Sequence, residues 1–305
     1  MFSILIPTFN NLDYLKICID SIKKNSNFSH QIIIHINEGN DGTLDYVKKN
    51  NFDFTYSEKN IGMPKALNQS SKLSKFDYIL ISHDDFYYCP NWDLEFKKEI
   101  DSYDHNNFYI SGIMINYKKK NELNNQDLLP PVFDAGIDPK NFDENKLLNN
   151  LENIKTFDYQ GTTKCPGLIH KKLWNEVGGW SEEFTPTGGD DSDFAMKLWQ
   201  NNIRIFKGLG KCSVYHFGSV TTRKKNKNTF TYLGSRGNKI FLKKWKISIN
   251  FFEKFFLQSG IDKNKKLIFK KYIGPVTKPE KSFTYYYEII KCKVYLFYLY
   301  LIRFK

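Results

Sequence analysis

Apolar runs and helical periodicities alternate along the first hundred residues of the chain. Four short strand-like runs, rich in apolar residues, cover residues 2–6, 31–36, 52–56 and 78–82. Between the first two runs, apolar residues recur at helical spacing, namely Leu12, Leu15, Ile19 and Ile22. Strands that alternate with helices are typical of βαβ units, so the pattern predicts a mostly parallel sheet.

Polar or glycine-containing loops follow all four runs. If the strands are parallel neighbours, these loops line one crevice, which is where open α/β sheets bind ligands. The fourth run leads directly into HDDFYYCP, in which Asp84 and Asp85 are adjacent. Two acids at this point suggest a divalent cation beside a phosphate-bearing ligand. Because adjacent loop acids are more often simply solvated, the pair alone leaves both interpretations open.

The pattern is less regular after Asp85. Residues 117–160 are rich in Asn, Asp, Lys and Pro, and a long polar insertion of this kind is usually functional or mobile. Periodicity returns in EEFTPTGGDDSDFAMKLWQ, where Phe194 and Leu198 predict a helix with one buried face. Two closing strands are expected at residues 203–206 and 212–217.

Composition places the chain among ordinary folded proteins, with 41% hydrophobic and 26% charged residues in 305. The net charge of +12 is unevenly distributed. Residues 1–220 contain 24 Lys and Arg against 29 Asp and Glu, whereas residues 221–305 contain 21 against 4. A uniform nucleic-acid-binding surface is therefore not expected. The five cysteines lack metal-binding spacing and no signal peptide precedes the first strand, so we expect a cytoplasmic protein.

The segment from about residue 240 interleaves Lys with aromatic and aliphatic residues. Its longest uncharged apolar run, residues 294–302, is far shorter than the roughly 20 residues that span a bilayer. One interpretation is a helix that lies on an anionic membrane surface, through residues 241–305. The other is a helix packed on the main domain with a solvated basic face, and the sequence does not decide between them.

Five segments in order carry a family resemblance: FSILIPTFNNLDYLKICIDSI, NEGNDGT, NIGMPKALNQS, HDD, and GGWSEEF with GGDDSDFAMKLWQ. Together they resemble glycosyltransferase family 2, over roughly residues 1–245. The resemblance implies an α/β GT-A fold, with a Rossmann-like, mostly parallel central sheet flanked by helices. Residues 1–105 would form a nucleotide-sugar-binding half and residues 106–240 an acceptor-binding half, followed by a basic, aromatic helical extension at 241–305.

The resemblance also implies a donor site and a metal site. The residues expected to bind the donor are Pro7, Thr8, Asn10, Glu38, Asp41, Asn60, Gly62, Lys65 and Asp84. The family's DXD-type motif corresponds to His83, Asp84 and Asp85, which makes Asp85 the firmest ligand for Mg²⁺ or Mn²⁺. His216, in VYHFGS, falls where many members place a further metal ligand. His83 stands where the family usually has Asp, and its alternative role is a hydrogen-bonded structural histidine.

On the acceptor side, Asp190 and Asp191 match the family's acidic pair. By resemblance Asp191 is the general base, and Asp190 and Trp180 would contact the acceptor. Acids at this position also suit the N-terminus of the following helix, and Trp180 can equally belong to the core. The QxxRW motif of processive synthases is absent, which favours transfer of one sugar at a time.

The sequence thus predicts an inverting, metal-dependent glycosyltransferase. Its donor would be a nucleoside diphosphate sugar, and its acceptor a glycan or lipid-linked glycan in surface polysaccharide or lipopolysaccharide synthesis. The enzyme would be cytoplasmic and associated with the membrane surface through its basic extension. Two alternatives stay open: an inactive glycan- or nucleotide-binding module, and a transferase that acts on a protein or a soluble glycan.

Overall fold

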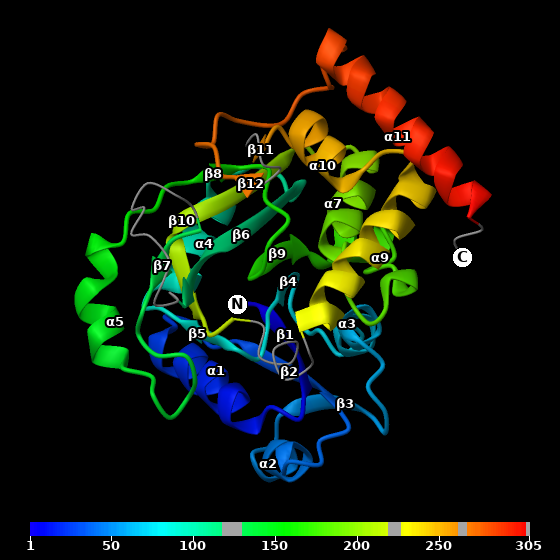
Figure 1. Ribbon diagram of the computed structural model, residues 1–305. Coiled ribbons are helices and arrows are strands. Elements are labelled where there is room, and N and C mark those ends of the chain that lie inside the picture. Colours follow the sequence, from blue (N-terminus) through cyan, green and yellow to red (C-terminus); the bar gives the residue numbers. More distant parts are fainter. Residues whose placement is uncertain (118–129, 219–226, 262–266, 303–305) are drawn as a thin grey trace.

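The computed structural model describes residues 1–117, 130–218, 227–261 and 267–302. Within these residues, ten strands form one sheet, in the order β3-β2-β1-β4-β9-β6-β10-β5 with β7 beside β6 and β8 beside β10 (Figure 1). The first four strands match the four apolar runs: β1 (Ser3–Phe9), β2 (Gln31–Asn37), β3 (Asp53–Ser57) and β4 (Tyr78–Ile81). All four are parallel, as the sequence predicts.

The second half of the sheet mixes strand directions. It contains β5 (Phe86–Tyr88), β6 (Phe108–Tyr117), β7 (Val132–Phe133), β8 (Tyr159–Gln160), β9 (Gly167–His170) and β10 (Ile205–His216). β9 is antiparallel to both β4 and β6, whereas β10 is parallel to β6 and antiparallel to β5. The sequence wrongly divides β10 into two closing strands. Its pairing with β6 continues on both sides of a register shift between Gly208 and Ser213, so the apparent turn is a bulge within one strand.

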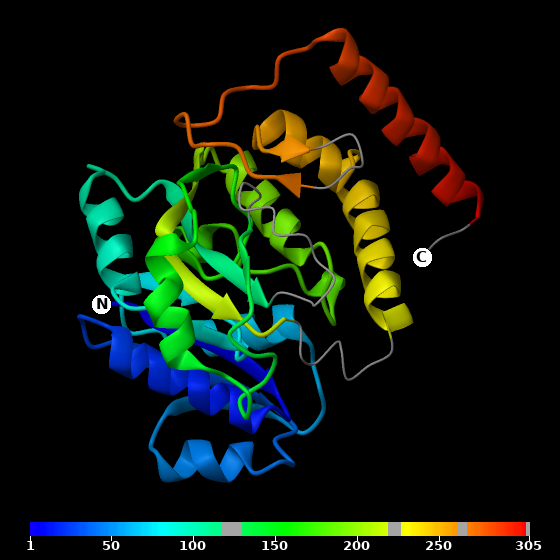
Figure 2. The ribbon, with the colours of Figure 1, turned by 60° about the vertical axis from the view of Figure 1, so that its left-hand side comes forward.

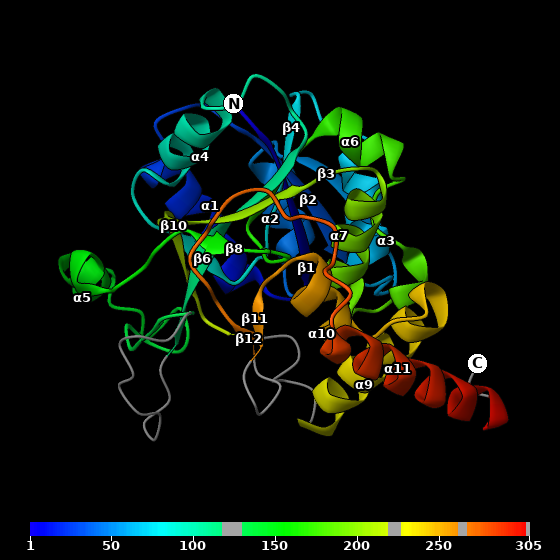
Figure 3. The ribbon, with the colours of Figure 1, turned by 90° about the horizontal axis from the view of Figure 1, so that it is seen from above.

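Helices cover both faces of this sheet. They are α1 (Leu12–Asn25), α2 (Thr43–Lys49), α3 (Met63–Ser71), α4 (Trp92–Asp101), α5 (Glu144–Asn150), α6 (Lys171–Glu176) and α7 (Asp190–Gln200), with single 3-10 turns at Leu151–Asn153 and Glu182–Phe184. Figure 3 shows α1 and α4 on one side of the sheet and α3, α6 and α7 on the other. The expected apolar stripe of α1 is buried against the sheet, because Leu15, Ile19 and Ile22 are at most 2% exposed. Of the polar stretch 117–160, residues 118–129 lie outside the described part.

The C-terminal extension packs closely on α7. It consists of α9 (Lys227–Trp245), α10 (Ile249–Phe251), a π-helical turn (Phe252–Phe256), the hairpin β11 (Gly260–Ile261) and β12 (Leu267–Ile268), and α11 (Phe283–Leu301). The boundary suggested after residue 240 falls inside α9, whose Phe241 and Leu242 are buried in the main core. A Cβ on Gly237 would lie 1.9 Å from the carbonyl oxygen of Gly188, so α9 touches the backbone of the loop before α7.

Helix α11 runs along the outside of the molecule (Figure 2). Its buried residues are Cys292 and Leu299. Its other large apolar residues are mostly exposed, with Ile290 at 59%, Val294 at 64% and Phe297 at 64%. Among the described residues, no helix combines the length and the apolar character that crossing a bilayer requires.

Candidate active site

The sheet brings the turn after β4 and the end of β10 to one edge. β5 follows this turn directly and pairs antiparallel with β10, which puts His216 opposite Phe86. Asp85 is 5% exposed in the turn, and its backbone carbonyl accepts a hydrogen bond from the Phe217 N–H at 3.2 Å. This pairing holds His216 beside Asp85, although the two residues lie far apart in the sequence.

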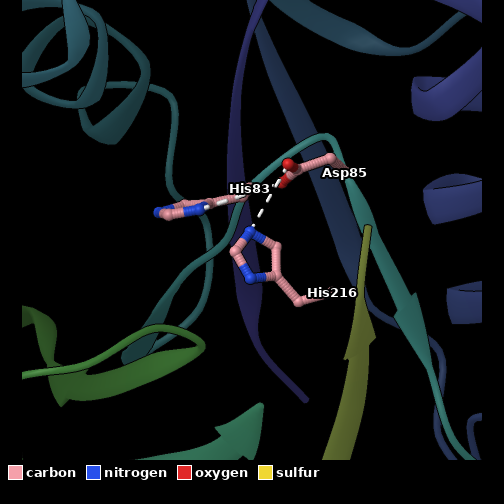
Figure 4. A group of neighbouring side chains, drawn as sticks. All are labelled: His83, Asp85 and His216. Atoms are coloured by element: carbon pink, nitrogen blue, oxygen red, sulfur yellow. Dashed lines mark ion pairs between the residues drawn. The ribbon is translucent and has the colours of Figure 1, made fainter. Parts of the chain in front are cut away.

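Three side chains at this edge surround a common space (Figure 4). Nε2 of His216 lies 3.4 Å from Oδ2 of Asp85, and Nδ1 of His83 lies 4.0 Å from Oδ1 of the same carboxylate. One ligand atom from each residue lies within 4.8 Å of the other two. Imidazole nitrogens and carboxylate oxygens both bind divalent transition metals, so this group can hold a metal ion.

The hydrogen bonding of His216 suits a metal ligand. Its Nδ1 lies 2.9 Å from Oδ1 of Asn116, on the adjacent strand β6. An amide oxygen can only accept, so Nδ1 carries a proton and Nε2, which lies toward Asp85, is the nitrogen that a metal could bind. A second partner that fixes the tautomer in this way is typical of ligating histidines.

His83 stacks on Phe86, with ring centroids 4.8 Å apart and planes 17° from parallel. Burial lowers the pKa of His83 to about 4, and the carboxylates of Asp85 and Asp191 partly oppose that shift. His83 is therefore neutral at physiological pH, which is the form that binds a metal.

Asp84 points away from this group, toward β1. Its Oδ2 accepts a hydrogen bond of 2.7 Å from Oγ1 of Thr8, which follows the half-buried Pro7. Burial, followed by the charge of Asp85, raises the pKa of Asp84 to about 7. The turn therefore offers two unlike carboxyl groups, one held by the end of β1 and one beside the two histidines.

The loops after β1 and β2 are tied together at the same edge. The side chain of Asn10 donates to Glu38 at 3.2 Å and accepts from the backbone N–H of Asn40 at 2.8 Å. Asp41 accepts from the backbone N–H of Leu12 at 2.8 Å and so caps α1. Asn10 and Glu38 thus form a rim beside the turn after β4, while the carboxylate of Asp41 is used in holding the loops.

Asn37 joins three strand ends and has no counterpart among the predicted residues. It is 4% exposed, donates to the carbonyl of Thr8 at 3.2 Å, and accepts from the backbone N–H of Ile61 at 2.9 Å. The sequence could have indicated this role through the position of Asn37 at the end of β2, because a buried amide there must find hydrogen-bond partners in neighbouring loops.

The turn between β3 and α3 packs against the loop before α7. Asn60 accepts from the backbone N–H of Gly62 at 2.9 Å, and the N–H of Met63 donates to the carbonyl of Pro186 at 2.9 Å. Gly62 has φ +78°, and a Cβ there would lie 2.6 Å from Cα of Pro186. Only glycine fits this contact without strain. Lys65 lies half-buried on the first turn of α3.

Asp190 and Asp191 begin α7 but have different surroundings. Asp190 is 4% exposed and accepts from Oγ1 of Thr187 and the N–H of Gly188, both at 3.0 Å. Burial, followed by the charge of Asp191, raises the pKa of Asp190 to about 7. The side chain of Asp191 is 29% exposed. Asp191 is therefore the solvent-accessible member of the pair.

Lys164 is a second residue that the sequence did not indicate. Its Nζ lies 3.1 Å from Oδ2 of Asp191, and Oδ1 of Asp191 accepts from the N–H of Ser192 at 2.8 Å. The charge of Asp191 raises the pKa of Lys164, which keeps it an ammonium ion. A single lysine in the turn TTKCP carries no motif, so only the tertiary contact reveals it.

Trp180 lies in the core beneath the acceptor-side loop. It is 3% exposed, and its ring centroid is 5.9 Å from that of Phe194. Its backbone N–H donates to Oδ1 of Asn68 on α3 at 2.9 Å. Trp180 is therefore a core residue, which is the alternative role that the sequence left open.

Comparisons with known proteins agree with this architecture. Residues 3–165, more than half of the chain, match the profile of the family described as glycosyl transferase family 2. No curated protein matches the chain. The crystal structure of Staphylococcus aureus TarS 1–349 is similar, with a TM-score of 0.52 and 17% identity, over 70% of this chain and 60% of that one.

The same S. aureus fragment in complex with UDP gives a TM-score of 0.51 and 18% identity, over 70% of this chain and 59% of that one. This chain therefore spans less than two thirds of the length of these structures. The likeness confirms the predicted GT-A fold. With the family profile and the fold in agreement, the chain belongs to glycosyl transferase family 2.

Proposed function

We propose that this protein transfers a single sugar from a nucleoside diphosphate sugar to a glycan hydroxyl, with a divalent metal ion and with inversion at the anomeric carbon. The observation that carries the proposal is the position of two groups at one edge of the sheet. The Asp85, His83 and His216 cluster lies at the end of β10, and the part-exposed Asp191, whose charge acts on the pKa of His83, begins α7. This arrangement suits a leaving group and a base on opposite sides of one sugar.

The donor would lie along the ends of β1 to β4. In the proposal, Pro7, Thr8, Asn10 and Glu38 line the nucleoside, while Asp41 holds the loop that carries Glu38. Asn60, Gly62 and Lys65 would face the pyrophosphate, where glycine allows a close backbone approach and lysine supplies positive charge. Asp84, held by Thr8, would accept from a ribose hydroxyl. The UDP complex of the S. aureus relative makes uridine donors the first to test.

The residues of the cluster fit a metal ion. The orientation of His216 by Asn116 and the neutral state of His83 both suit ligation, and Asp85 supplies a buried carboxylate. Two imidazoles and one carboxylate favour Mn²⁺ over Mg²⁺, because Mg²⁺ is usually bound through oxygen alone. A metal bound there would neutralise charge on the departing nucleoside diphosphate.

Asp191 would act as the general base. It would take the proton from the acceptor hydroxyl as that oxygen forms its bond to the anomeric carbon and the bond to the diphosphate breaks. A carboxylate works here through its position, since the proton moves late in an oxocarbenium-like transition state. One base and no enzyme nucleophile give inversion. Asp190 would hold the loop that shapes the acceptor side, with Trp180 beneath it.

A screen of nucleotide sugars for Mn²⁺-dependent hydrolysis tests this function without knowledge of the acceptor. UDP-, GDP- and dTDP-sugars would each be incubated with the protein, and the released diphosphate measured. Asp191→Asn should abolish hydrolysis while leaving donor binding intact, and Asp85→Ala should abolish both metal dependence and turnover. Asp53→Asn is the matched control, because its exposed ion pair with Lys75 lies at the opposite end of the strands. Full activity in Asp191→Asn would contradict the proposal.

We further propose that the acceptor is lipid-linked and that α11 holds the enzyme at an anionic membrane surface. Exposed apolar side chains such as Ile290, Val294 and Phe297 would enter the interface, and the excess of Lys and Arg in residues 221–305 would attract anionic headgroups. A second copy of the chain is a less suitable partner for this face, because it would bring two strongly positive segments together.

Vesicle flotation tests this membrane surface. The protein should float with phosphatidylglycerol-containing vesicles and not with phosphatidylcholine alone. The double variant Ile290→Ser and Phe297→Ser should lose flotation, whereas Tyr232→Ser, which removes a side chain 65% exposed on α9, should not. Unchanged flotation of the double variant would contradict the proposed membrane surface. So would a wild-type dimer that becomes a monomer in the double variant.

A further inference from the structure

Three charged residues from separate segments meet around the N-terminus of α7. Lys164 comes from the turn between β8 and β9, Asp191 from α7, and Glu253 from the π-helical turn of the C-terminal extension. The Lys164 ammonium lies 3.1 Å from Oδ2 of Asp191. Glu253 is 9% exposed and accepts from Oγ of Ser192, the residue after Asp191, at 3.5 Å.

The turn that carries Lys164 is rigidly supported from below. Oγ of Ser111 lies 2.6 Å from Oγ1 of Thr162 and 2.9 Å from the hydroxyl of Tyr159, and all three residues are buried. Thr162 in turn accepts from the backbone N–H of Lys164 at 3.2 Å. Tyr109 donates to the carbonyl of Lys164 at 3.2 Å. These bonds fix the backbone from which the lysine reaches Asp191.

We infer that Lys164 is a positioning residue for the reaction: its ammonium holds one oxygen of Asp191 in place and supplies positive charge beside that carboxylate, and Glu253 offsets part of this charge. The inference rests on the proposed role of Asp191 as general base. It adds that the C-terminal extension takes part in the catalytic site through Glu253.

The charge balance around Asp191 supports this role. The groups that face Asp191 are Asp190 on its own helix, Lys164 and Cys165 in the β8–β9 turn, His83 after β4, Tyr109 on β6 and Glu253 in the extension. Lys164 is the cation among these groups. Without it, Asp191 would lie among acids and neutral groups, and proton binding by Asp191 would become easier.

Lys164 and Glu253 should therefore have opposite effects on the acid side of the pH profile. Replacing Lys164 by Met removes the cation, so the low-pH limb of kcat/KM should move up by about one pH unit. Replacing Glu253 by Gln removes a competing acid near Lys164, so the same limb should move down. A merely structural role for either residue would change stability or the height of the profile, and would leave the position of the limb unchanged.

The experiment measures Mn²⁺-dependent hydrolysis against pH, with the nucleotide sugar that gives the fastest turnover in the screen above. The low-pH limb of kcat/KM should shift up in Lys164→Met, shift up by less in Lys164→Arg, and shift down in Glu253→Gln. In Lys164→Met, the activity near neutral pH should also fall about tenfold or more. Lys207→Met is the matched control. It removes another lysine that is paired with a carboxylate, Glu99, at 2.7 Å but lies away from the site.

The outcomes separate the two hypotheses. If Asp191→Asn is inactive and the limb stays fixed in Lys164→Met and Glu253→Gln, the inference is overturned and the proposed base stands. If Asp191→Asn is active, the proposed base itself fails. If Lys164→Met does not fold, the direction of the shift in Glu253→Gln decides, and an unmoved or upward-shifted limb overturns the inference.

Discussion

The Nε2 of His216 lies 3.4 Å from Oδ2 of Asp85, and the opposite ring nitrogen of His216 is held by Asn116. The strand order explains this geometry, because β10 lies between β6, which carries Asn116, and β5, which follows Asp85 directly. The candidate metal site is therefore built from residues on or next to three neighbouring strands, with β10 in the middle.

Asn116→Ala is expected to weaken Mn²⁺ binding about 10- to 100-fold, because His216 loses the partner that fixes its tautomer. His216→Ala should weaken it further, since a ligand is lost. Mn²⁺ affinity is measured by electron paramagnetic resonance, without any substrate. Asn106→Ala, which removes an amide that accepts from the Tyr78 hydroxyl at the far end of the sheet, serves as the control. Wild-type affinity in His216→Ala would exclude His216 as a ligand.

Gly62→Ala is expected to destabilise the protein by about 1–3 kcal/mol, through positive φ and the clash with Pro186 together. Gly178→Ala provides a matched comparison, because Gly178 has φ +70° and a Cβ there would meet nothing within 4 Å. Chemical denaturation of both variants isolates the clash. Equal losses would mean that the contact between the β3–α3 turn and the loop before α7 gives way easily.

Local patterns were enough to predict the first four strands. Each of them falls on a strand-like run in the sequence, and Asp84 and Asp85 follow the fourth, so local strand signals and chain order suffice there. The antiparallel insertion of β9 between β4 and β6 is not readable in this way. It depends on long-range pairing, as does the bulge that makes β10 one strand instead of two.

The residues of the candidate site also divide into those that local motifs predict and those that only tertiary contacts reveal. Asp85, Asp191 and His216 were predicted from short motifs, and the structure places His216 beside Asp85. Lys164 and Glu253 were not predicted, because a lone Lys and a lone Glu have no sequence pattern that distinguishes them from solvated surface charges. Lys164 approaches α7 from the β8–β9 turn and Glu253 approaches it from the C-terminal extension, and both approaches are tertiary contacts.

The stability of the protein should fall as the pH drops from about 6.5 toward 4, in part because of His35. This side chain is fully buried on β2, and burial lowers its pKa to about 4. Between these pH values the unfolded chain binds a proton that the folded chain does not, so acid favours unfolding. The contribution is at most about 3 kcal/mol. This contribution of neutral, buried His35 to the free energy of unfolding is fully present above pH 6.5 and is lost below pH 4.

His35→Gln should remove this part of the pH dependence, and the exposed His105→Gln should leave it unchanged. Urea denaturation at a series of pH values compares the slopes of the unfolding free energy. An unchanged slope in His35→Gln would show that other groups cause the acid sensitivity.

The attachment of α9 to α7 depends on Asp193, which is fully buried. Its Oδ1 accepts from Nε1 of Trp245 at 2.7 Å and lies 2.9 Å from Nζ of Lys244. Asp193→Ala should destabilise the protein by about 3 kcal/mol, because it leaves the indole N–H of Trp245 without its acceptor and removes one of the two carboxylates beside the Lys244 ammonium.

Lys244→Met should cost less than Asp193→Ala, since the lysine is 27% exposed and the carboxylate keeps its bond to Trp245. Thermal unfolding of the two variants and of the double variant measures the coupling between the residues. Strong coupling is expected, because the same carboxylate oxygen serves both partners. Additive effects would mean that Lys244 stabilises the protein through its other partner, Glu183, whose Oε1 lies 2.7 Å from the lysine Nζ. In that case Trp245 and apolar packing would hold α9 to α7.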